Sequence, residues 1–357
     1  MIFLVFTAFN SVHADERVLP AAMLIKMGFQ PFENFRHYRG SVRVQSDLPQ
    51  NIPWPITFLD AGHTIAQNYV NFQDYGDGGP YYHKGCDLRT QAGSWVKAPV
   101  TGVLEGGYYG YSNNPDGSQK KFWKPWNGQT HSDPYFELAL VTQDGYRFEL
   151  HHVNSLNLPQ STIDALNKGG VVIPAGTNIG HVLPWPDGVY NHIHYNIFRQ
   201  DGVIENPEFH SLQVPDHVPP KIYGVYGLQA NGSVIQLNSG GTVSNGIKEI
   251  VVATTENRDN DTYVQTPPFI GLHFDSGAQT IWDFRHFLIT ADGKWPDIRE
   301  VFLPALRLPN GQRVVTFGQF GKGMFLMRLK VPTSTGHFTI KVGDTAGNFS
   351  NFEGTVQ

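Results

Sequence analysis

The chain of 357 residues contains a single cysteine, and only 16% of its residues are charged. One cysteine excludes an internal disulfide and any cysteine-rich zinc site. Coiled coils and long helical bundles need abundant Ala, Glu, Lys and Leu, and 38 glycines with 24 prolines exclude them here. A formal net charge of −5 lacks the basic footprint of a nucleic-acid binder, so we expect no nucleic-acid partner.

Aromatic residues make up 13% of the chain, which separates it from disordered acidic or basic tails. Short aromatic and Val/Ile runs alternate with Gly and Pro, a pattern that predicts a mainly β, loop-rich fold. The length allows one large domain or two ordinary ones. With 15 histidines and almost no cysteine, histidine and carboxylate are the expected ligands of any metal.

The N-terminal segment resembles a secretory signal. Met1 to Phe9 form an apolar run, and the small residue Ala14 precedes the polar pair Asp15 and Glu16. This pattern predicts a signal peptide over residues 1–14 and an exported protein, periplasmic or secreted, although the segment lacks the usual Lys or Arg. A buried N-terminal strand is the alternative. No stretch approaches the length of a transmembrane helix, so we expect no membrane span.

A proline-dense stretch at 214–220 cannot continue a helix or an inner strand and is predicted to be a linker. It divides the chain into a first domain, 15–213, and a second, 221–357. Beyond it, several short alternating runs with regular turns predict a β-sandwich. The last of these runs, 336–342, is followed by an Asp-Thr-Ala-Gly-Asn turn that resembles bacterial immunoglobulin-like modules. Further runs of this kind are Lys248–Ala253 and Phe325–Val331.

Two local features of the first domain are also predicted. A short helix is expected over 162–168, with Ser161 as its N-cap, Asp164 in its first turn and Gly169 at its end. The stretch from Tyr108 to Asp133 is expected to be a long loop rich in Tyr, Trp and Lys. Its basic and aromatic part, Gln119 to Trp126, is interpreted as a solvated loop, with a wall facing the substrate as the alternative.

Histidines with metal-ligand spacing form the main functional signal. On a strand, side chains two apart share a face, so His83 and Asp87 would project together with Gly85 leaving space between them. His192 and His194 would likewise share a face. If the two strands are neighbours, His83, Asp87 and one histidine of the pair converge. Two imidazoles and one carboxylate are the ligand set of a catalytic zinc site, which keeps a fourth position open.

Other histidines and the cysteine are less informative. His151 and His152 are adjacent, so a strand would send them to opposite faces and only one would join the site. Cys86 would point away from the ligands and act as a small buried hydrophobic residue. The remaining histidines are expected on the surface or satisfied in the core, with a substrate role as the alternative for His181; they include His63, His131, His181 and His210.

These motifs, in this order, resemble the lysostaphin-like and LytM-type zinc endopeptidases, which cleave peptide bridges in bacterial peptidoglycan. The resemblance spans about Ala66 to Phe209, the motif core 66–209. The matching segments are His83-Lys84-Gly85-Cys86-Asp87-Leu88, Gly93, Val96-Lys97-Ala98-Pro99, Gly102-Val103, Leu150-His151-His152-Val153 (an imperfect match), Val172 to Gly180, His192-Ile193-His194-Tyr195-Asn196-Ile197 and Asn206-Pro207.

The resemblance implies that His83, Asp87 and His194 bind one Zn²⁺ and that His152 and His192 are uncoordinated catalytic histidines. One imidazole would accept a proton from a zinc-activated water, and the other would stabilise the developing oxyanion. The implied protein is an exported zinc endopeptidase acting on peptidoglycan or another peptide. Its fold would be an antiparallel-sheet endopeptidase domain followed by an immunoglobulin-like β-sandwich.

The sequence departs from the family around these motifs. The family's Gly/Ser/Thr-rich turn is replaced by Pro184–Tyr190, and Asn196 stands where the family has its closing Glu. The ligand positions are unaffected, whereas substrate preference is left open. Aromatic residues near the motifs are candidates to line a peptide groove; they are Tyr81, Tyr82, Trp185 and Tyr190.

Two other functions compete with the endopeptidase. A non-catalytic relative would bind the cell wall or activate another hydrolase, but such relatives usually lose ligands. A D-Ala-D-Ala carboxypeptidase would space its His and Asp by seven residues, whereas His83 and Asp87 are four apart. The sequence leaves open whether Asp15 to Asp60 is a blocking prosegment, what the second domain binds, and the oligomeric state.

Overall fold

The computed structural model describes residues 48, 50–73, 81–113, 119–130, 132, 134–199, 204–243, 246–284, 297–316, 323–332 and 335–357. For residue 81 and residues 109–113 and 119–123 it describes the backbone alone. The predicted signal peptide, 1–14, lies outside this part of the chain. Within it, strands dominate and two short α-helices occur, which confirms the mainly β fold.

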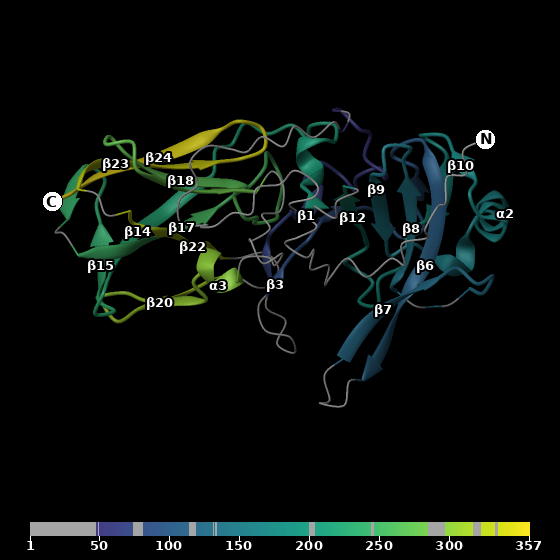
Figure 1. The fold of residues 1–357 in the computed structure, drawn as a ribbon, viewed down its shortest axis with the longest axis horizontal. Helices are drawn as coiled ribbons and strands as arrows, with labels where there is room; N and C mark the ends of the chain where they lie inside the picture. The colour runs from purple at the N-terminus through teal and green to yellow at the C-terminus, as the bar shows by residue number, and fades with distance from the viewer. Residues whose placement is uncertain are drawn as a thin grey trace, which may run out of the picture.

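Figure 1 shows two β-rich bodies side by side along the long axis of the molecule. The first is built on a nine-stranded sheet with the order β1-β4-β12-β9-β8-β6-β10, in which β13 also pairs with β12 and β7 with β6. All its pairings are antiparallel. The strands are β1 (Ile65–Gln67), β4 (Cys86–Arg89), β6 (Gly102–Asn113), β7 (Gln119–Pro125), β8 (Phe136–Val141), β9 (Arg147–His151), β10 (Val172–Ile173), β12 (His192–Phe198) and β13 (Ile204–Glu205).

Smaller elements surround this sheet. Two two-stranded ribbons pair β2 with β3 and β5 with β11. Short helices connect the strands, and α2 lies at the outer end of the body (Figure 1). Their bounds are β2 (Phe72–Gln73), β3 (Tyr81–Tyr82), β5 (Trp95–Lys97), β11 (Asn178–His181), α2 (Gln160–Lys168) and the 3₁₀ helices η1 (Ser155–Asn157) and η2 (Pro207–Phe209).

The predicted helix exists but begins earlier than expected. It starts at Gln160, directly after Pro159, so Ser161 lies inside the helix and is not its N-cap. Pro159 makes no side-chain cap, but its carbonyl accepts hydrogen bonds from the first turn, as from the amide of Ile163 at 3.1 Å. Proline's fixed φ suits the start of a helix. Gly169 ends the helix in a left-handed conformation with φ 67°, as predicted.

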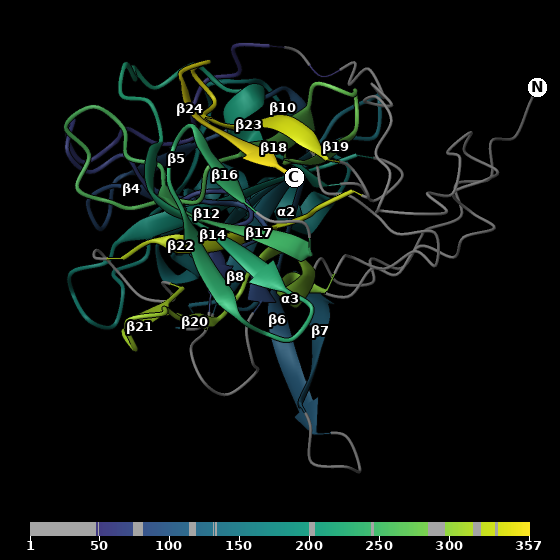
Figure 2. The ribbon, with the colours of Figure 1, turned by 90° about the vertical axis from the view of Figure 1, so that its left-hand side faces the viewer.

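The expectation of a long loop from 108 to 133 is wrong. Strands β6 and β7 pair from Gly107 opposite Pro125 to Asn113 opposite Gln119, so this stretch is mostly a β-hairpin. The hairpin projects away from the body in Figures 1 and 2. The Tyr, Phe and Trp residues that suggested a substrate-facing loop also favour strands, and that preference decides the structure here.

The second body is a β-sandwich, as predicted. One sheet has the order β15-β14-β17-β22 and the other β16-β24-β23-β18-β19, with only β16 and β24 parallel. The three alternating runs identified in the sequence lie in β17, β22 and β23. The bounds are β14 (Lys221–Gln229), β15 (Val234–Leu237), β16 (Gly241–Val243), β17 (Ile247–Thr255), β18 (Phe269–Phe274), β19 (Gln279–Asp283), α3 (Ile298–Val301), β20 (Ala305–Arg307), β21 (Arg313–Val315), β22 (Phe325–Lys330), β23 (Gly336–Gly343) and β24 (Phe349–Val356).

The segment between the two bodies, 212–220, forms neither helix nor strand, and β14 begins directly after it at Lys221. Its proline content accounts for this irregular path. Among the described helices, none has the length and apolar character needed to cross a bilayer.

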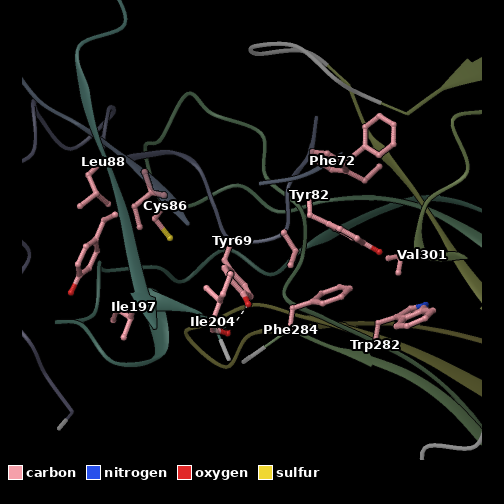
Figure 3. Packing of buried hydrophobic residues seen from close by; sticks show 14 of the residues in the cluster. Tyr69, Phe72, Tyr82, Cys86, Leu88, Ile197, Ile204, Trp282, Phe284 and Val301 are labelled. Carbon is pink, nitrogen blue, oxygen red and sulfur yellow. Dashed lines mark hydrogen bonds between the residues drawn. The ribbon is translucent and has the colours of Figure 1, made fainter. Parts of the chain in front are cut away.

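One hydrophobic core runs through both bodies. In Figure 3, Cys86 and Ile197 of the first body and Trp282 of the second belong to the same cluster. Phe302, fully buried after α3, packs its ring 6.3 Å from that of Tyr82. Tyr82 is therefore a core residue at the junction, 5% exposed, and the expectation that it lines a peptide groove is wrong.

Because this core is shared, we predict that the two bodies unfold in one cooperative transition. Phe302→Ala should lower the free energy of unfolding by about 3–5 kcal/mol, since it removes a buried aromatic ring between Phe72 and Tyr82. Denaturant unfolding followed by tryptophan fluorescence and by circular dichroism measures both effects. Val315→Ala, at a half-exposed position, is the control and should change stability by about 0.5 kcal/mol or less. Two separate transitions in the wild type would contradict the shared core.

Candidate metal centre

The central strands of the first sheet place three candidate residues in a row. β12 lies between β4 and β9, and its His194 pairs with Asp87 on one side and with His151 on the other. Residues directly opposite each other in neighbouring strands project from the same face of the sheet. The strands β4 and β12, which carry the two motifs, are therefore neighbours, as the convergence of their side chains requires.

His83 reaches the same face by a different route from the one expected. It does not share a strand with Asp87, because β3 ends at Tyr82 and β4 begins at Cys86. The chain bends between them, and the His83 backbone is held by hydrogen bonds with Val70 and Asn71 at 2.7 and 2.8 Å. The side chain still points at Asp87, with 3.0 Å from Nε2 to Oδ1.

Gly85 makes this bend possible. A Cβ atom at this position would lie 2.0 Å from the Asn196 Oδ1 atom and 2.5 Å from the Tyr195 carbonyl oxygen. It would also lie 3.0 Å from His194 Nε2. No real Cβ tolerates such contacts with backbone, so the glycine in the motif is required for the close approach of this bend to β12.

Three ligand-type atoms converge on one point. His83 Nε2 lies 2.9 Å from His194 Nδ1, and Asp87 Oδ1 lies 3.0 and 2.9 Å from these two nitrogens. Ligands of tetrahedral zinc at 2.0–2.1 Å are separated by about 3.3 Å, so the observed triangle needs only a small expansion. His83 and Asp87 are buried, and His194 is 17% exposed at its side chain.

The neighbours of these residues favour metal binding. The Nδ1–H of His83 donates to the Asn68 carbonyl at 3.0 Å, which leaves Nε2 as the atom with a lone pair in the neutral ring. The second Asp87 oxygen accepts a hydrogen bond from the Tyr190 hydroxyl at 3.1 Å. Two imidazole nitrogens and one carboxylate oxygen, each oriented by an outer hydrogen bond or strand, suit Zn²⁺.

His152 and His192 lie beside this triangle and face each other, with ring centroids 4.7 Å apart. Each ring donates its Nδ1–H to a backbone carbonyl at 2.7 Å, that of Pro134 for His152 and that of Tyr190 for His192. The Nε2 atom of each neutral ring is therefore a proton acceptor. His192 Nε2 lies 3.8 Å from Asp87 Oδ1.

The strand alternation that was expected to separate the two adjacent histidines does not extend to His152. Strand β9 ends at His151, and His152 adopts a left-handed backbone with φ 65°, so strand alternation no longer decides where its side chain points. The ring centroids of His151 and His152 lie 5.1 and 6.4 Å from that of His194.

His151 belongs to a neighbouring acidic group that the sequence analysis missed. Its ring nitrogens lie 3.2 Å from Glu137 Oε2 and 3.3 Å from Glu149 Oε2. Arg147 bridges the two glutamates, at 3.3 Å from Glu137 and 2.6 Å from Glu149. Burial is outweighed by Arg147 and His151, which lower the pKa of Glu149 to about 2. The alternation Arg147-Phe-Glu149-Leu-His151 was the available signal, because it predicts three polar side chains on one strand face.

The protonation states follow from burial and charge. Burial, reinforced by His192, holds the pKa of His152 well below its usual value. Burial also lowers the pKa of His192, and that of His194 to about 4. At His83 the Asp87 carboxylate outweighs burial and raises the pKa, whereas the surrounding imidazoles hold the pKa of Asp87 well below its usual value despite burial.

The loop Pro184–Tyr190 places aromatic rings against the site. Asp187 shapes it by accepting hydrogen bonds from the amides of Val189 and Tyr190 at 2.8 Å. The Trp185 ring lies 4.6 Å from that of His152 and 4.8 Å from that of His192. Trp185 and Tyr190 therefore contact the candidate site, and a peptide groove along them stays a prediction.

The remaining residues singled out in the sequence lie away from the triangle. Cys86 is fully buried on the core side, and its Sγ lies 3.9 Å from Glu208 Oε1. Burial raises the pKa of its thiol well above the usual value, as fits a structural cysteine. His63 bonds Asp60, His181 stacks on Trp95 and His210 is buried beside Glu205, whereas His131 and the side chain of Tyr81 lie outside what the structure describes.

Comparison with known proteins gives weak structural similarities. No protein-family model matches the sequence, and no curated protein matches it. Among solved structures, Csd3 of Helicobacter pylori gives a TM-score of 0.28 at 13% identity, over 46% of this chain and 35% of the Csd3 chain. The antimicrobial peptidase lysostaphin of Staphylococcus simulans gives 0.28 at 12% identity, over 83% and 96%. The catalytic domain of lysostaphin gives 0.25 at 18% identity, over 39% and 85%. Values this low establish no function for the chain.

The lowered pKa values of His152 and His194 predict that chelator-treated protein loses stability in acid. The unfolded chain takes up these protons near pH 6.5, whereas the folded site resists them, down to about 4 at His194. The unfolded state thus binds more protons in this window. The free energy of unfolding should fall below pH 6.5 by about 1.4 kcal/mol per pH unit for each such imidazole. His83, whose pKa is raised, acts in the opposite direction and only above pH 6.5.

Denaturant unfolding at pH 7 and pH 5 measures this dependence. His152→Gln should lose less stability between the two pH values than the wild type, because it no longer carries the buried imidazole. His181→Gln, at a histidine outside the site, is the matched control and should keep the wild-type slope. Equal slopes in all three proteins would contradict the assignment.

Proposed function

We propose that the chain is an exported zinc metalloendopeptidase that hydrolyses peptide bonds in peptidoglycan cross-links. The observation that carries this proposal is the triangle of His83 Nε2, Asp87 Oδ1 and His194 Nδ1, whose edges are 2.9–3.0 Å. These three residues would hold Zn²⁺ and leave one coordination position open, as in catalytic rather than structural zinc sites. The motif order in the sequence supports the same assignment.

In this proposal zinc, when bound, polarises the scissile carbonyl and lowers the pKa of water toward neutrality. His152 and His192 then do the proton chemistry. Both carry a lowered pKa and are neutral at pH 7, with Nε2 free of the backbone hydrogen bond that holds Nδ1. Each can therefore accept a proton, and neither can donate from Nε2 until it has accepted one.

This order assigns the two histidines complementary roles. The imidazole that takes the proton from water becomes a donor and can deliver it to the leaving amine. The other imidazole faces the first at 4.7 Å. It would have to take a proton from solvent at Nε2 before it could donate that proton in a hydrogen bond to the negative oxygen. Trp185 packs against both rings and would exclude water from them.

The proposal also covers the rest of the chain. Residues 1–14 would direct export, 15–213 would form the catalytic domain, 214–220 the linker and 221–357 the immunoglobulin-like domain. The substrate would be peptidoglycan or another peptide, bound along the aromatic residues Trp185 and Tyr190. Neither nucleic acid nor a membrane span enters this function.

Two measurements, of the metal bound to the protein and of the peptides released from peptidoglycan, test the proposal. The purified protein should contain about one zinc per chain, because the site offers three ligands from the chain. It should release peptides from peptidoglycan, as followed by mass spectrometry, and a chelator should abolish the release. His83→Ala should lose both metal and activity. His192→Gln should keep the metal and lose about 10²–10⁴-fold in rate, because it removes only the proton acceptor.

His181→Gln is the control, and its zinc content and activity should match the wild type. If the protein binds stoichiometric zinc but hydrolyses no type of cell wall, the proposed enzymatic activity is overturned. That result would favour the non-catalytic, wall-binding alternative. Release of free D-Ala would instead indicate a carboxypeptidase. The identity of the new C-terminus in the products therefore separates the three functions.

The Tyr190 hydroxyl provides a second test, because it bonds the ligand Asp87 from outside the triangle. Tyr190→Phe should weaken zinc affinity about 10–100-fold, as loss of an outer hydrogen bond to a metal ligand does. Competition with a chromophoric zinc chelator measures the affinity. Tyr223→Phe, at a half-exposed residue of β14, is the control and should bind zinc as tightly as the wild type. An unchanged affinity in Tyr190→Phe would show that the hydroxyl does not support the ligand.

A further inference from the structure

Three carboxylates from distant parts of the chain meet at the end of the β-sandwich that faces the first body. Asp216 lies in the segment that joins the two bodies, Glu256 directly follows β17, and Asp344 directly follows β23. Each offers an oxygen atom, and these three atoms all lie within 4.8 Å of one another. All three residues are buried, with exposures of 8%, 1% and 7%.

The hydrogen bonds to these three carboxylates do not balance their negative charge. Asp344 accepts from the backbone amide and the side-chain amide of Asn348, at 2.8 and 2.7 Å. One Asp216 oxygen accepts from the Val218 amide at 3.1 Å, and the other has no hydrogen-bond partner among the described residues. Neither Glu256 oxygen has a donor from outside the cluster, although its carboxyl lies within hydrogen-bond reach of the Asp216 carboxyl. The most buried of the three carboxylates is thus the one with no donor from outside the cluster.

Arg258 acts electrostatically on Glu256, but its charge is already matched by another carboxylate. Its guanidinium forms an ion pair with Glu208 and a hydrogen bond with Gln265. Glu208 in turn accepts a hydrogen bond from the Thr345 hydroxyl at 3.2 Å. The pair of Arg258 and Glu208 is therefore neutral as a unit, so Arg258 offsets the charge of the three carboxylates beside it only in part.

Three ionised carboxylates cannot share a buried space unless something positive lies between them. Burial, together with Asp216 and Asp344 and against the opposing effect of Arg258, raises the pKa of Glu256 to about 9. Burial also raises the pKa of Asp344. Such a group is neutralised either by a proton on Glu256 or by a cation that all three residues bind.

The ligand atoms indicate the kind of cation. All are carboxylate oxygens, which are hard ligands, and neither imidazole nor thiol belongs to the group. Ca²⁺ binds such oxygens at 2.3–2.6 Å, so two of its ligands can lie up to about 5 Å apart. Mg²⁺ binds at 2.0–2.1 Å, keeps several waters and rarely occupies a cage made by protein alone. A buried site with three carboxylates therefore favours Ca²⁺.

We propose that Asp216, Glu256 and Asp344 bind Ca²⁺ and that this ion fixes the joining segment to the β-sandwich. The ion would neutralise the unpaired oxygens of Glu256 and Asp216 together. Because Asp216 belongs to the segment between the bodies, bound Ca²⁺ stabilises their junction beside the Arg258–Glu208 pair. This site is separate from the zinc triangle and does not depend on its activity.

Calcium titration of the full-length protein, stripped of metal with a chelator and then reloaded with zinc in calcium-free buffer, tests the proposal. Isothermal titration calorimetry should give one site, with a dissociation constant of about 10⁻⁴–10⁻³ M if the site behaves as an extracellular calcium module. Millimolar CaCl₂ should raise the melting temperature by several degrees, because the ion binds only the folded state. MgCl₂ at the same ionic strength should have little effect.

Glu256→Gln keeps the shape of the side chain, removes its charge and should weaken calcium binding about tenfold or more. Glu353→Gln, at an exposed residue of β24, is the matched control and should bind calcium as the wild type does. His83→Ala should also keep the calcium response, which separates this site from the zinc function. Absence of calcium binding in the wild type, an equal effect of Mg²⁺, or full binding by Glu256→Gln would each overturn the proposal. If Glu256→Gln is more stable and calcium has no effect, the carboxylates share a proton instead.

Discussion

The register between β4 and β12 determines whether this chain can form its candidate site. It sets Asp87 opposite His194 on one face of the sheet and Cys86 opposite Tyr195 on the other. A slip by one residue would move the ligands into the core and the core residues into the site. The fully buried Ile193 and Tyr195 resist that slip, because their burial is possible in one register only. The apolar face therefore holds the polar face in place.

The second body supports the ligand His83 as well. Asn68 and Asn71, whose carbonyls hold the ring and backbone of His83, are both tied to Thr266 of the sandwich by hydrogen bonds of 2.8 and 2.7 Å. Arg89 lies 4.6 Å from the Tyr190 ring and 5.9 Å from the ring of Tyr263, also of the sandwich. The site is thus built by one body and braced by the other, which agrees with their shared core.

Strand spacing brought together His83, Asp87 and one histidine of the pair His192 and His194 as candidates, and the family resemblance then selected His194 as the ligand. The details depended on the backbone. His152 leaves the strand pattern through a positive φ, and His83 reaches the site through a bend at Gly85. The hairpin formed by β6 and β7 and the cluster around Glu256 were not predicted. Predicting the hairpin would have required giving the strand preference of its aromatic residues more weight than its loop-like composition. The cluster depends on where the ends of β17 and β23 lie in the folded chain, which the sequence pattern does not indicate.

The structure compensates its buried carboxylates in different ways, and this contrast supports the calcium site. Asp87 is surrounded by imidazoles, and Glu137 and Glu149 are bridged by Arg147. Glu256 is buried as deeply as these residues, yet among the described residues no donor from outside its cluster reaches it. Burial of a carboxylate without compensation costs several kcal/mol, which a protein of ordinary stability cannot lose at each such group. A cation shared with Asp216 and Asp344 would compensate Glu256 as Arg147 compensates Glu149.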